Sequence, residues 1–309
     1  YLDFTVDIPM DDLVLYIVGN GFDLHHQIKS SYSDFGTYVK TVDPEFYNTF
    51  ERYFPIAGNW ANFEEVLGLF DADCLLDDNA AYFVSYGDED WSDANHHDYQ
   101  YEVEKVVTAL SGTLMRRFTT WVTTLQIPDS RSFTGTLLNL DRNSLYLTFN
   151  YTCTLQRLYE VPPQNVLHIH NEAINEESEL ILGHARNPSD MTSQNNSADL
   201  EAQDPRITEA NETIDQFFSD TYKPTKEIIA KHSAFFGNLK DVEQINVMGH
   251  SLSEVDLPYL MEIANNIARD RVRWVISYNS KTSIPAFECT MTKLGIRASL
   301  TSFIPIKHF

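Results

Sequence analysis

Short runs of consecutive apolar residues recur along the chain, and segments with a helical spacing of apolar residues separate most of them. The first run, 13–19, is rich in β-branched residues and ends in glycine, which is typical of a strand buried on both faces of a parallel sheet. Similar runs follow at 145–149, 166–170, 180–183, 245–249 and 272–278. The alternation of such strands with helices predicts a doubly wound, mainly parallel, Rossmann-like α/β sheet.

The region between the first two predicted strands has a helical pattern. Apolar residues repeat at helical steps in three segments, 34–41, 44–53 and 60–70. A longer repeat then runs from Val103 to Leu125, and it predicts a helix of about 25 residues with one apolar face. Pro128 follows and is expected to stop this helix.

These patterns suggest two parts. We interpret 10–40 and 136–309 as a Rossmann-like nucleotide-binding domain, and 41–135 as an inserted helical subdomain that could cover the nucleotide. Met10 is followed directly by the first strand region, so residues 1–9 are interpreted as an extension ahead of a native start.

Charge changes the picture of possible partners. The net charge of −23 repels polyphosphate, so nucleic-acid binding over a broad face is not expected. A nucleotide-sized anion can still bind to oriented N–H groups at the start of a helix. Residues 71–104 carry 11 acids and no Lys or Arg, which is typical of a solvated, mobile face. A docking surface for a basic partner is the alternative.

Composition also bears on the class of protein. The chain has 43% hydrophobic residues but no apolar run near the roughly 18 residues of a membrane helix. No secretory segment precedes residue 15. Cys74, Cys153 and Cys289 are odd in number and widely spaced, which argues against a disulfide framework and a cysteine zinc site. We therefore expect a protein of the cytoplasm, without membrane association.

The first candidate site is Gly19-Asn20-Gly21-Phe22-Asp23, directly after the first strand. Two glycines allow a tight turn and a close approach to a pyrophosphate, and the helix that follows offers N–H donors. The dehydrogenase fingerprint requires a third small residue where Leu24 stands, so hydride transfer is disfavoured. An ordinary strand-to-helix turn, with Asp23 near the helix start, is the alternative.

Two further candidates follow the next strands. Asn150 could cap a helix starting near Tyr151, or its amide could hold a ribose hydroxyl or a water. His168 and His170 would point to the same face of a strand, a spacing that also suits a metal, but no acid accompanies them at ligand spacing. No metal is expected. We favour His170 as a general base and His168 as a hydrogen-bonded interior histidine.

The last candidate is the stretch "INVMGHSLSEVDLPYL" at 245–260. Gly249, His250 and Ser251 follow a predicted strand, where a glycine permits close approach and a hydroxyl can bond to ribose or phosphate. Ser253 and Asp256 have the spacing of a capping box at a helix start, which is the structural alternative.

Together, "YIVGNGFDLHHQIKSSYSDF", "TFNYTCTLQRLY", "HIHN", "LILGH" and "INVMGHSLSEVDLPYL" resemble the AbiH family of bacterial phage-abortive-infection proteins. The motifs extend from residue 15 to about 260. The family in turn looks like a divergent branch of the sirtuin-like NAD-binding folds.

The sirtuin resemblance implies roles for particular residues. Gly19, Gly21 and Phe22 match the turn that receives the NAD pyrophosphate, and Asn20 lies between them. Asp34, in Tyr32-Ser33-Asp34-Phe35, stands where sirtuins carry a Pro-Asp-Phe segment near the nicotinamide pocket. Asn150 matches the Asn that orients ribose or water, and His170 matches the catalytic His. Gly249 and Ser251, which flank His250, match the segment that binds the adenosine half of NAD.

The match has two departures. Asn171 replaces the Gly that follows the catalytic His in sirtuins, and the paired Cys-x-x-Cys zinc module is missing. Deacylation is therefore not implied. Sirtuin-like defence proteins without that module are commonly NAD hydrolases, so the resemblance implies NAD as a substrate that is cleaved at the nicotinamide–ribose bond.

The predicted catalytic set is Asn150, His170, Asp34 and Asp23. Asn150 would position the water or ribose, His170 would accept a proton, and Asp34 or Asp23 would favour the oxocarbenium-like transition state. Two alternatives stay open: a non-catalytic sensor of NAD, ADP-ribose or a signalling nucleotide acting through a protein partner, and a metal hydrolase using His168, His170 and His184. A homo-oligomer and a phage-derived or defence-system partner are further expectations.

Overall fold

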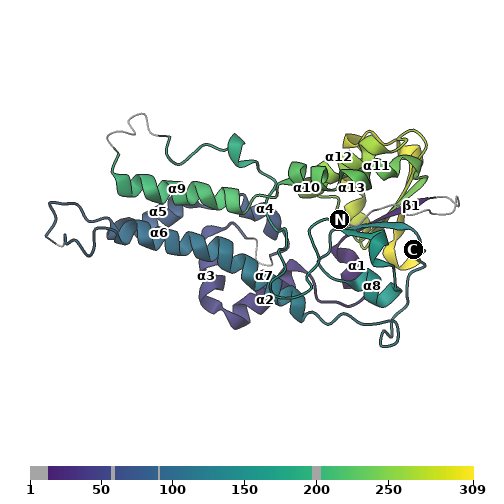
Figure 1. Ribbon diagram of the computed structural model, residues 1–309, viewed down its shortest axis with the longest axis horizontal. Coiled ribbons are helices and arrows are strands. Elements are labelled where there is room, and N and C mark those ends of the chain that lie inside the picture. Colours follow the sequence, from purple (N-terminus) through teal and green to yellow (C-terminus); the bar gives the residue numbers. More distant parts are fainter. Residues whose placement is uncertain (1–12, 57–59, 90, 197–202) are drawn as a thin grey trace. The chain divides into compact units, whose positions relative to one another are not determined.

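The structure is a computed structural model that describes residues 13–56, 60–89, 91–196 and 203–309 (Figure 1). These residues divide into two compact units. The sheet unit comprises the described residues up to Ser31, together with Val122–Ile181 and Pro224–Phe309. The helical unit comprises the described parts of Tyr32–Trp121 and Leu182–Lys223. It thus begins before residue 41 and takes in a later stretch that the sequence pattern assigns to the nucleotide-binding domain.

A single parallel sheet of six strands forms the centre of the sheet unit within the described residues. Its strands are β1 (Val14–Val18), β2 (Leu145–Thr148), β3 (Val166–His168), β4 (Gln244–Met248), β5 (Arg273–Tyr278) and β6 (Thr301–Pro305). The strand order is β3-β2-β1-β4-β5-β6, the order of dinucleotide-binding Rossmann folds. The predicted fold class is confirmed, and the topological switch point lies between β1 and β4.

Three details of the sheet differ from the sequence pattern. Residues 180–183 are not a strand, although Leu180 and Leu182 are buried; the nearest ladder contact is an isolated bridge from His184 to Tyr222. The edge strand β6 was not predicted. The third strand ends at His168, and His170 lies in the turn beyond it. His168 and His170 therefore do not share a strand face.

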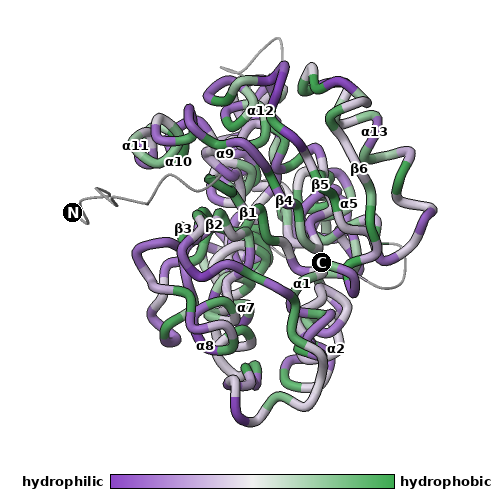
Figure 2. Tube along the Cα trace, turned by 90° about the vertical axis from the view of Figure 1, so that its right-hand side faces the viewer, coloured by the Kyte–Doolittle hydropathy of each residue, from purple (hydrophilic) through white to green (hydrophobic). Residues whose placement is uncertain are grey.

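Helices cover both faces of the sheet. Alternate residues of β1 therefore belong to two different hydrophobic clusters, one on each face. Leu15 and Ile17 belong to the hydrophobic cluster that includes Tyr259 and Ile263 of α12 (Leu257–Asn266). Tyr16 and Val18 belong to the cluster with residues of α8 (Thr154–Tyr159). Figure 2 shows β1 and β4 largely in the colour of hydrophobic residues. Burying each large apolar side chain contributes about 1.5–3 kcal/mol.

The other α-helices of the sheet unit are short. They are α1 (Asn20–His25), α10 (Thr225–Lys231), α11 (Ser233–Gly237) and α13 (Ile284–Lys293). Among the helices described for the chain, none is long and apolar enough to cross a bilayer. Cys74, Cys153 and Cys289 are free thiols.

The helical unit follows its predicted pattern closely in its first half. Its α-helices are α2 (Tyr32–Val42), α3 (Pro44–Tyr53), α4 (Phe63–Leu67), α5 (Ala72–Asn79), α6 (Asp98–Thr108), α7 (Leu114–Thr124) and α9 (Pro205–Asp220), and α7 continues past the boundary of the unit. A π-helical turn, Ala109–Thr113, joins α6 to α7, so the predicted long helix forms nearly without interruption. Figure 1 shows α6 and α9 side by side. Stacked and edge-on aromatic rings, with Trp60 and Phe63 nearly parallel at 5.4 Å, fill the core.

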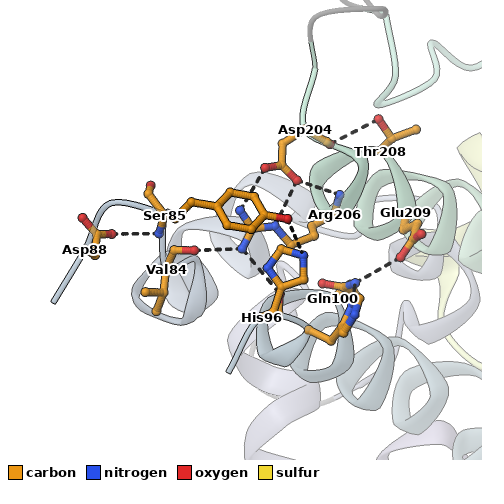
Figure 3. Close-up of polar contacts among 11 residues, drawn as sticks. Val84, Ser85, Asp88, His96, Gln100, Asp204, Arg206, Thr208 and Glu209 are labelled. Atoms are coloured by element: carbon orange, nitrogen blue, oxygen red, sulfur yellow. Dashed lines mark hydrogen bonds and ion pairs between the residues drawn. The ribbon is translucent and has the colours of Figure 1, made fainter. Parts of the chain in front are cut away.

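The acidic stretch 71–104 has ordered parts. It contains α5, a 3₁₀ turn at Ala80–Tyr82 and the start of α6. Arg206 of α9 holds the loop between them: its guanidinium donates to the carbonyls of Val84 (2.9 Å) and His96 (3.4 Å) and pairs with Asp204 (Figure 3). It also lies 4.1 Å from the centre of the Phe83 ring. One buried cation thus ties the acidic loop to α9.

Candidate functional site

The two glycine loops at the switch point interlock. The N–H of Gly19 donates to the carbonyl of Met248 (3.0 Å), and that of Gly21 donates to the carbonyl of Gly249 (2.7 Å). A Cβ added at Gly19 would lie 2.6 Å from the Cα of His250, and one at Gly21 would lie 2.8 Å from the Cα of Gly249. This packing requires glycine whether or not a pyrophosphate binds, so the glycines alone do not identify a ligand.

Asn20 and Phe22 are held between the glycines and the rest of the unit. The Oδ1 of Asn20 accepts a hydrogen bond from the Ser30 hydroxyl (2.5 Å). The Phe22 ring is fully buried and packs against His26 (4.5 Å) and Tyr159 (5.7 Å between ring centroids). Phe22 is therefore a core residue that fixes the start of α1, with no ring face exposed for stacking.

Asp23 follows in α1 and is 1% exposed. Burial raises its pKa to about 6, while hydrogen bonds from the side chains of Thr152, Thr154 and Asn150 oppose the rise. The Thr152 hydroxyl donates to Oδ2 at 2.5 Å. We call Asp23, Asn150, Thr152 and Thr154 the Asp23 cluster. It brings together two of the predicted catalytic residues.

Asn150 lies two residues beyond β2 and is also buried. The helix-cap alternative is wrong, because α8 begins at Thr154 with Cys153 before it. The main chain of Asn150 is fixed on both sides: its N–H donates to Thr148 Oγ1 (3.1 Å), and its carbonyl accepts from His168 Nδ1 (3.0 Å). The side-chain amide of Asn150 lies close enough to Asp23 to lower the pKa of that carboxyl.

His168 is an interior histidine with both ring nitrogens engaged. Besides the bond to Asn150, its Nε2 accepts from the Gln156 amide (2.8 Å). Burial lowers its pKa, which favours the neutral ring that this arrangement requires. His168 therefore ties β3 to the loop after β2.

His170 is 3% exposed and lies in a second group of polar side chains. Its Nε2 is 4.0 Å from Oδ1 of Asp256, and its ring packs against Phe149 (5.4 Å) and Tyr259 (5.6 Å). Asn171 follows with φ +66°, a left-handed conformation that glycine adopts freely and asparagine tolerates.

The loop after β4 supplies the rest of this group. His250 is buried, and its Nε2 lies 3.4 Å from Oδ2 of Asp256. Ser251 is exposed. Of the capping-box alternative, only the position holds: Ser253 precedes the 3₁₀ turn Glu254–Asp256 as its N-cap residue but makes no side-chain cap, and its hydroxyl donates to Oδ2 of Asp256 at 3.5 Å. We call His170, His250 and Asp256 the Asp256 cluster.

Asp256 is the residue that the sequence interpretation missed. Its local signal, Ser-x-x-Asp before a helix, is that of a cap, and its histidine partners are distant in sequence. The loop after β2 touches both clusters: Asn150 belongs to the Asp23 cluster, while the preceding Phe149 ring contacts His170 and His250. Both clusters therefore lie at the carboxyl edge of the sheet.

Asp34 belongs to a different unit from the other predicted site residues. It is half-buried in the first turn of α2, in the helical unit, whereas the other predicted site residues all belong to the sheet unit. His184 also belongs to the helical unit, and burial lowers its pKa to about 4. In the described part of the chain, no group of three or more His, Cys, Asp or Glu side chains is arranged to hold a metal ion.

The strand order of the sheet, together with the polar side chains at the carboxyl edge of the sheet, defines a Rossmann-like α/β protein. The chain belongs to the AbiH family: the family model described as "Bacteriophage abortive infection AbiH" matches residues 15–278, from β1 to β5. This membership indicates a role in abortive-infection defence against phage. Searches of curated proteins and of solved structures gave no significant match.

Proposed function

We propose that this protein is an abortive-infection effector that hydrolyses NAD at the nicotinamide–ribose bond. The observation that carries the proposal is the buried Asp23 carboxyl, bonded by Thr152 and close to Asn150, at the carboxyl edge of a sheet with dinucleotide-binding strand order. A buried carboxyl beside an amide suits a reaction whose transition state gathers positive charge on the ribose. Family membership supplies the biological context.

Each proposed role follows from the chemistry. The bond between C1′ and the nicotinamide nitrogen breaks, and its electron pair leaves with nicotinamide. Water forms the new bond to C1′ and gives its proton to His170, so the products are nicotinamide, ADP-ribose and a proton. Asn150 positions the water or a ribose hydroxyl, and ionised Asp23 stabilises the cationic centre. Asp34 remains a second candidate for that carboxylate.

Nucleotide binding is assigned to the loops after β1 and β4. On the first side these are Gly19 and the first turn of α1, with Asn20, Gly21 and Phe22; on the second they are Gly249, His250 and Ser251. Because the Gly21 N–H already bonds to Gly249, a pyrophosphate would either displace this bond or bind beside it. His170 and Asn150 are each less than a tenth exposed, so NAD entry requires these loops to open.

The test is purified protein incubated with NAD, with nicotinamide and ADP-ribose separated by chromatography. Loss of product with Asn150→Ala and His170→Ala, but not with the exposed controls Asn175→Ala and His308→Ala, is expected. NAD levels in phage-infected cells expressing each variant give the same comparison under activating conditions. NAD that persists in both settings with the unaltered protein contradicts the proposal.

The burial of His170 and Asn150 favours a second candidate function, a non-catalytic sensor of NAD, ADP-ribose or a signalling nucleotide that acts through a protein partner. A sensor needs a closed state that a ligand opens, and it needs no water at the ribose. Calorimetry distinguishes the two: saturable binding of NAD without any product selects the sensor.

A further inference from the structure

Asp256 lies between two imidazoles that come from different loops. Its Oδ1 faces Nε2 of His170 at 4.0 Å, and its Oδ2 faces Nε2 of His250 at 3.4 Å. Only 7% of the residue is exposed, so the interaction of its charge with neighbouring groups is screened weakly. A carboxylate in this position acts on both rings.

The hydrogen-bond pattern fixes the tautomer of His250. Its Nδ1 accepts the main-chain N–H of Leu252 at 2.9 Å, so the hydrogen of the neutral ring must be on Nε2. That atom faces Oδ2 of Asp256, so its hydrogen is directed at the carboxyl oxygen. Leu252 has φ +54°, an uncommon conformation for a leucine, which the loop adopts while making this bond.

We propose that Asp256 is a positioning residue for His170, acting through the imidazole and not on the substrate. At 4.0 Å its carboxyl group lies beyond hydrogen-bond length of Nε2 and acts through its charge: it favours the ring hydrogen of His170 on Nε2, so that Nδ1 takes the proton from the nucleophile. The resulting imidazolium is stabilised by the neighbouring negative charge, and no proton passes to Asp256. The catalytic part of this inference rests on the proposed function, whereas the effect of Asp256 on the tautomer and pKa of His170 does not.

The groups that face His170 come from several elements. Asp256 precedes α12, Tyr259 is in α12, Tyr151 follows β2 with its ring 6.2 Å away, and His250 acts through Asp256. Asp256 is the carboxyl of this set. A change in the charge of Asp256 is therefore expected to alter the titration of His170 more than any other single change in the set.

The test is NMR of the ring nitrogens in histidine-labelled full-length protein, with His170 assigned from His170→Gln. In the unaltered protein, neutral His170 is expected to carry its hydrogen on Nε2; the Nδ1–H tautomer would overturn the proposal without any variant. Asp256→Asn is expected to lower the pKa of His170 by about one unit. Glu254→Gln, an exposed neighbour that pairs with Lys293, is the matched control and should leave that pKa unchanged.

Activity supplies the second readout. Asp256→Asn should lower kcat about 10-fold or more with little change in KM and should shift the acidic limb of the pH profile, and Asp256→Glu should recover part of the loss. An unchanged tautomer and pKa of His170 in folded Asp256→Asn would refute the positioning role. If the protein never cleaves NAD, the proposed function fails, whereas the NMR result still decides the role of Asp256.

Discussion

Gly21 donates its main-chain N–H to the carbonyl of Gly249 over 2.7 Å, which joins the loops after β1 and β4 at the switch point of the sheet. Gly249 adopts φ +64°, and a Cβ there would lie 2.1 Å from the nitrogen of Phe22. The contact between backbones leaves no room for a Cβ at Gly21 or at Gly249. Both the conformation and the spacing therefore select glycine.

Gly249→Ala is expected to destabilise the sheet unit strongly. The left-handed conformation alone costs about 1–3 kcal/mol for a non-glycine residue, and displacing the loop after β1 adds to this cost. Urea denaturation measures the change in the free energy of unfolding. Gly237→Ala, in α11 with nothing within 4 Å of the added Cβ, is the control and should be neutral or stabilising. Equal effects of the two substitutions would contradict this account.

The buried carboxyl of Asp23 should make stability depend on pH. Its pKa rises from 3.8 to about 6 on folding, so the folded state holds a proton that the unfolded state has released. Stability from this group is present below pH 3.8 and is lost as pH rises through 6, by about 3 kcal/mol in total.

Asp23→Asn isolates this contribution. The free energy of unfolding of the original protein, minus that of the variant, should fall between pH 4 and pH 7. Burial lowers the pKa of His26 to about 4, which gives the opposite slope in the same range, so the difference between proteins is the informative quantity. A difference that stays flat across this range would show that Asp23 titrates normally.

Arg206 should control the order of the loop between α5 and α6. Its guanidinium donates to two carbonyls of that loop and to Asp204, a geometry that lysine cannot reproduce. Arg206→Lys is expected to speed amide hydrogen exchange across 83–97 with little change in the sheet unit. Arg52→Lys, at the exposed pair with Asp78, serves as the control. Unaltered exchange in the loop would mean that other contacts hold it.

The strands that are buried on both faces could be predicted from the sequence, because a short uninterrupted apolar run such as Leu13–Val18 is typical of a strand covered on both sides. It missed β6, an edge strand with polar residues and Pro305, which has no ladder donor. The apolar stretch Leu180–Gly183 was wrongly predicted as a strand, because a buried segment without strand pairing shows the same apolar run in the sequence as a buried strand.

The candidate site also has a part that could be predicted from the sequence and a part that could not. The location of residues near strand ends, such as Asn150 and Gly249, could be predicted because topology brings strand ends to one edge of the sheet. Asp256 could not, since its meaning depends on His170 and His250 meeting in space, which no local spacing records. The tautomer of His250 depends on a main-chain bond from Leu252 and is likewise invisible in the sequence.

The proposed cleavage of NAD should require the ionised form of Asp23. Because the pKa of Asp23 is about 6, kcat should rise with pH through this value and level off near neutrality. Asp23→Asn should lower the plateau about 10²-fold or more and remove its own contribution to the inflection near pH 6, leaving the acidic limb that His170 sets, since a neutral amide stabilises the cationic ribose poorly. Asp34→Asn distinguishes the two candidate carboxylates: an intact inflection with a normal plateau assigns the role to Asp23. If Asp34→Asn abolishes turnover and Asp23→Asn does not, the charge that favours the transition state comes from α2 instead.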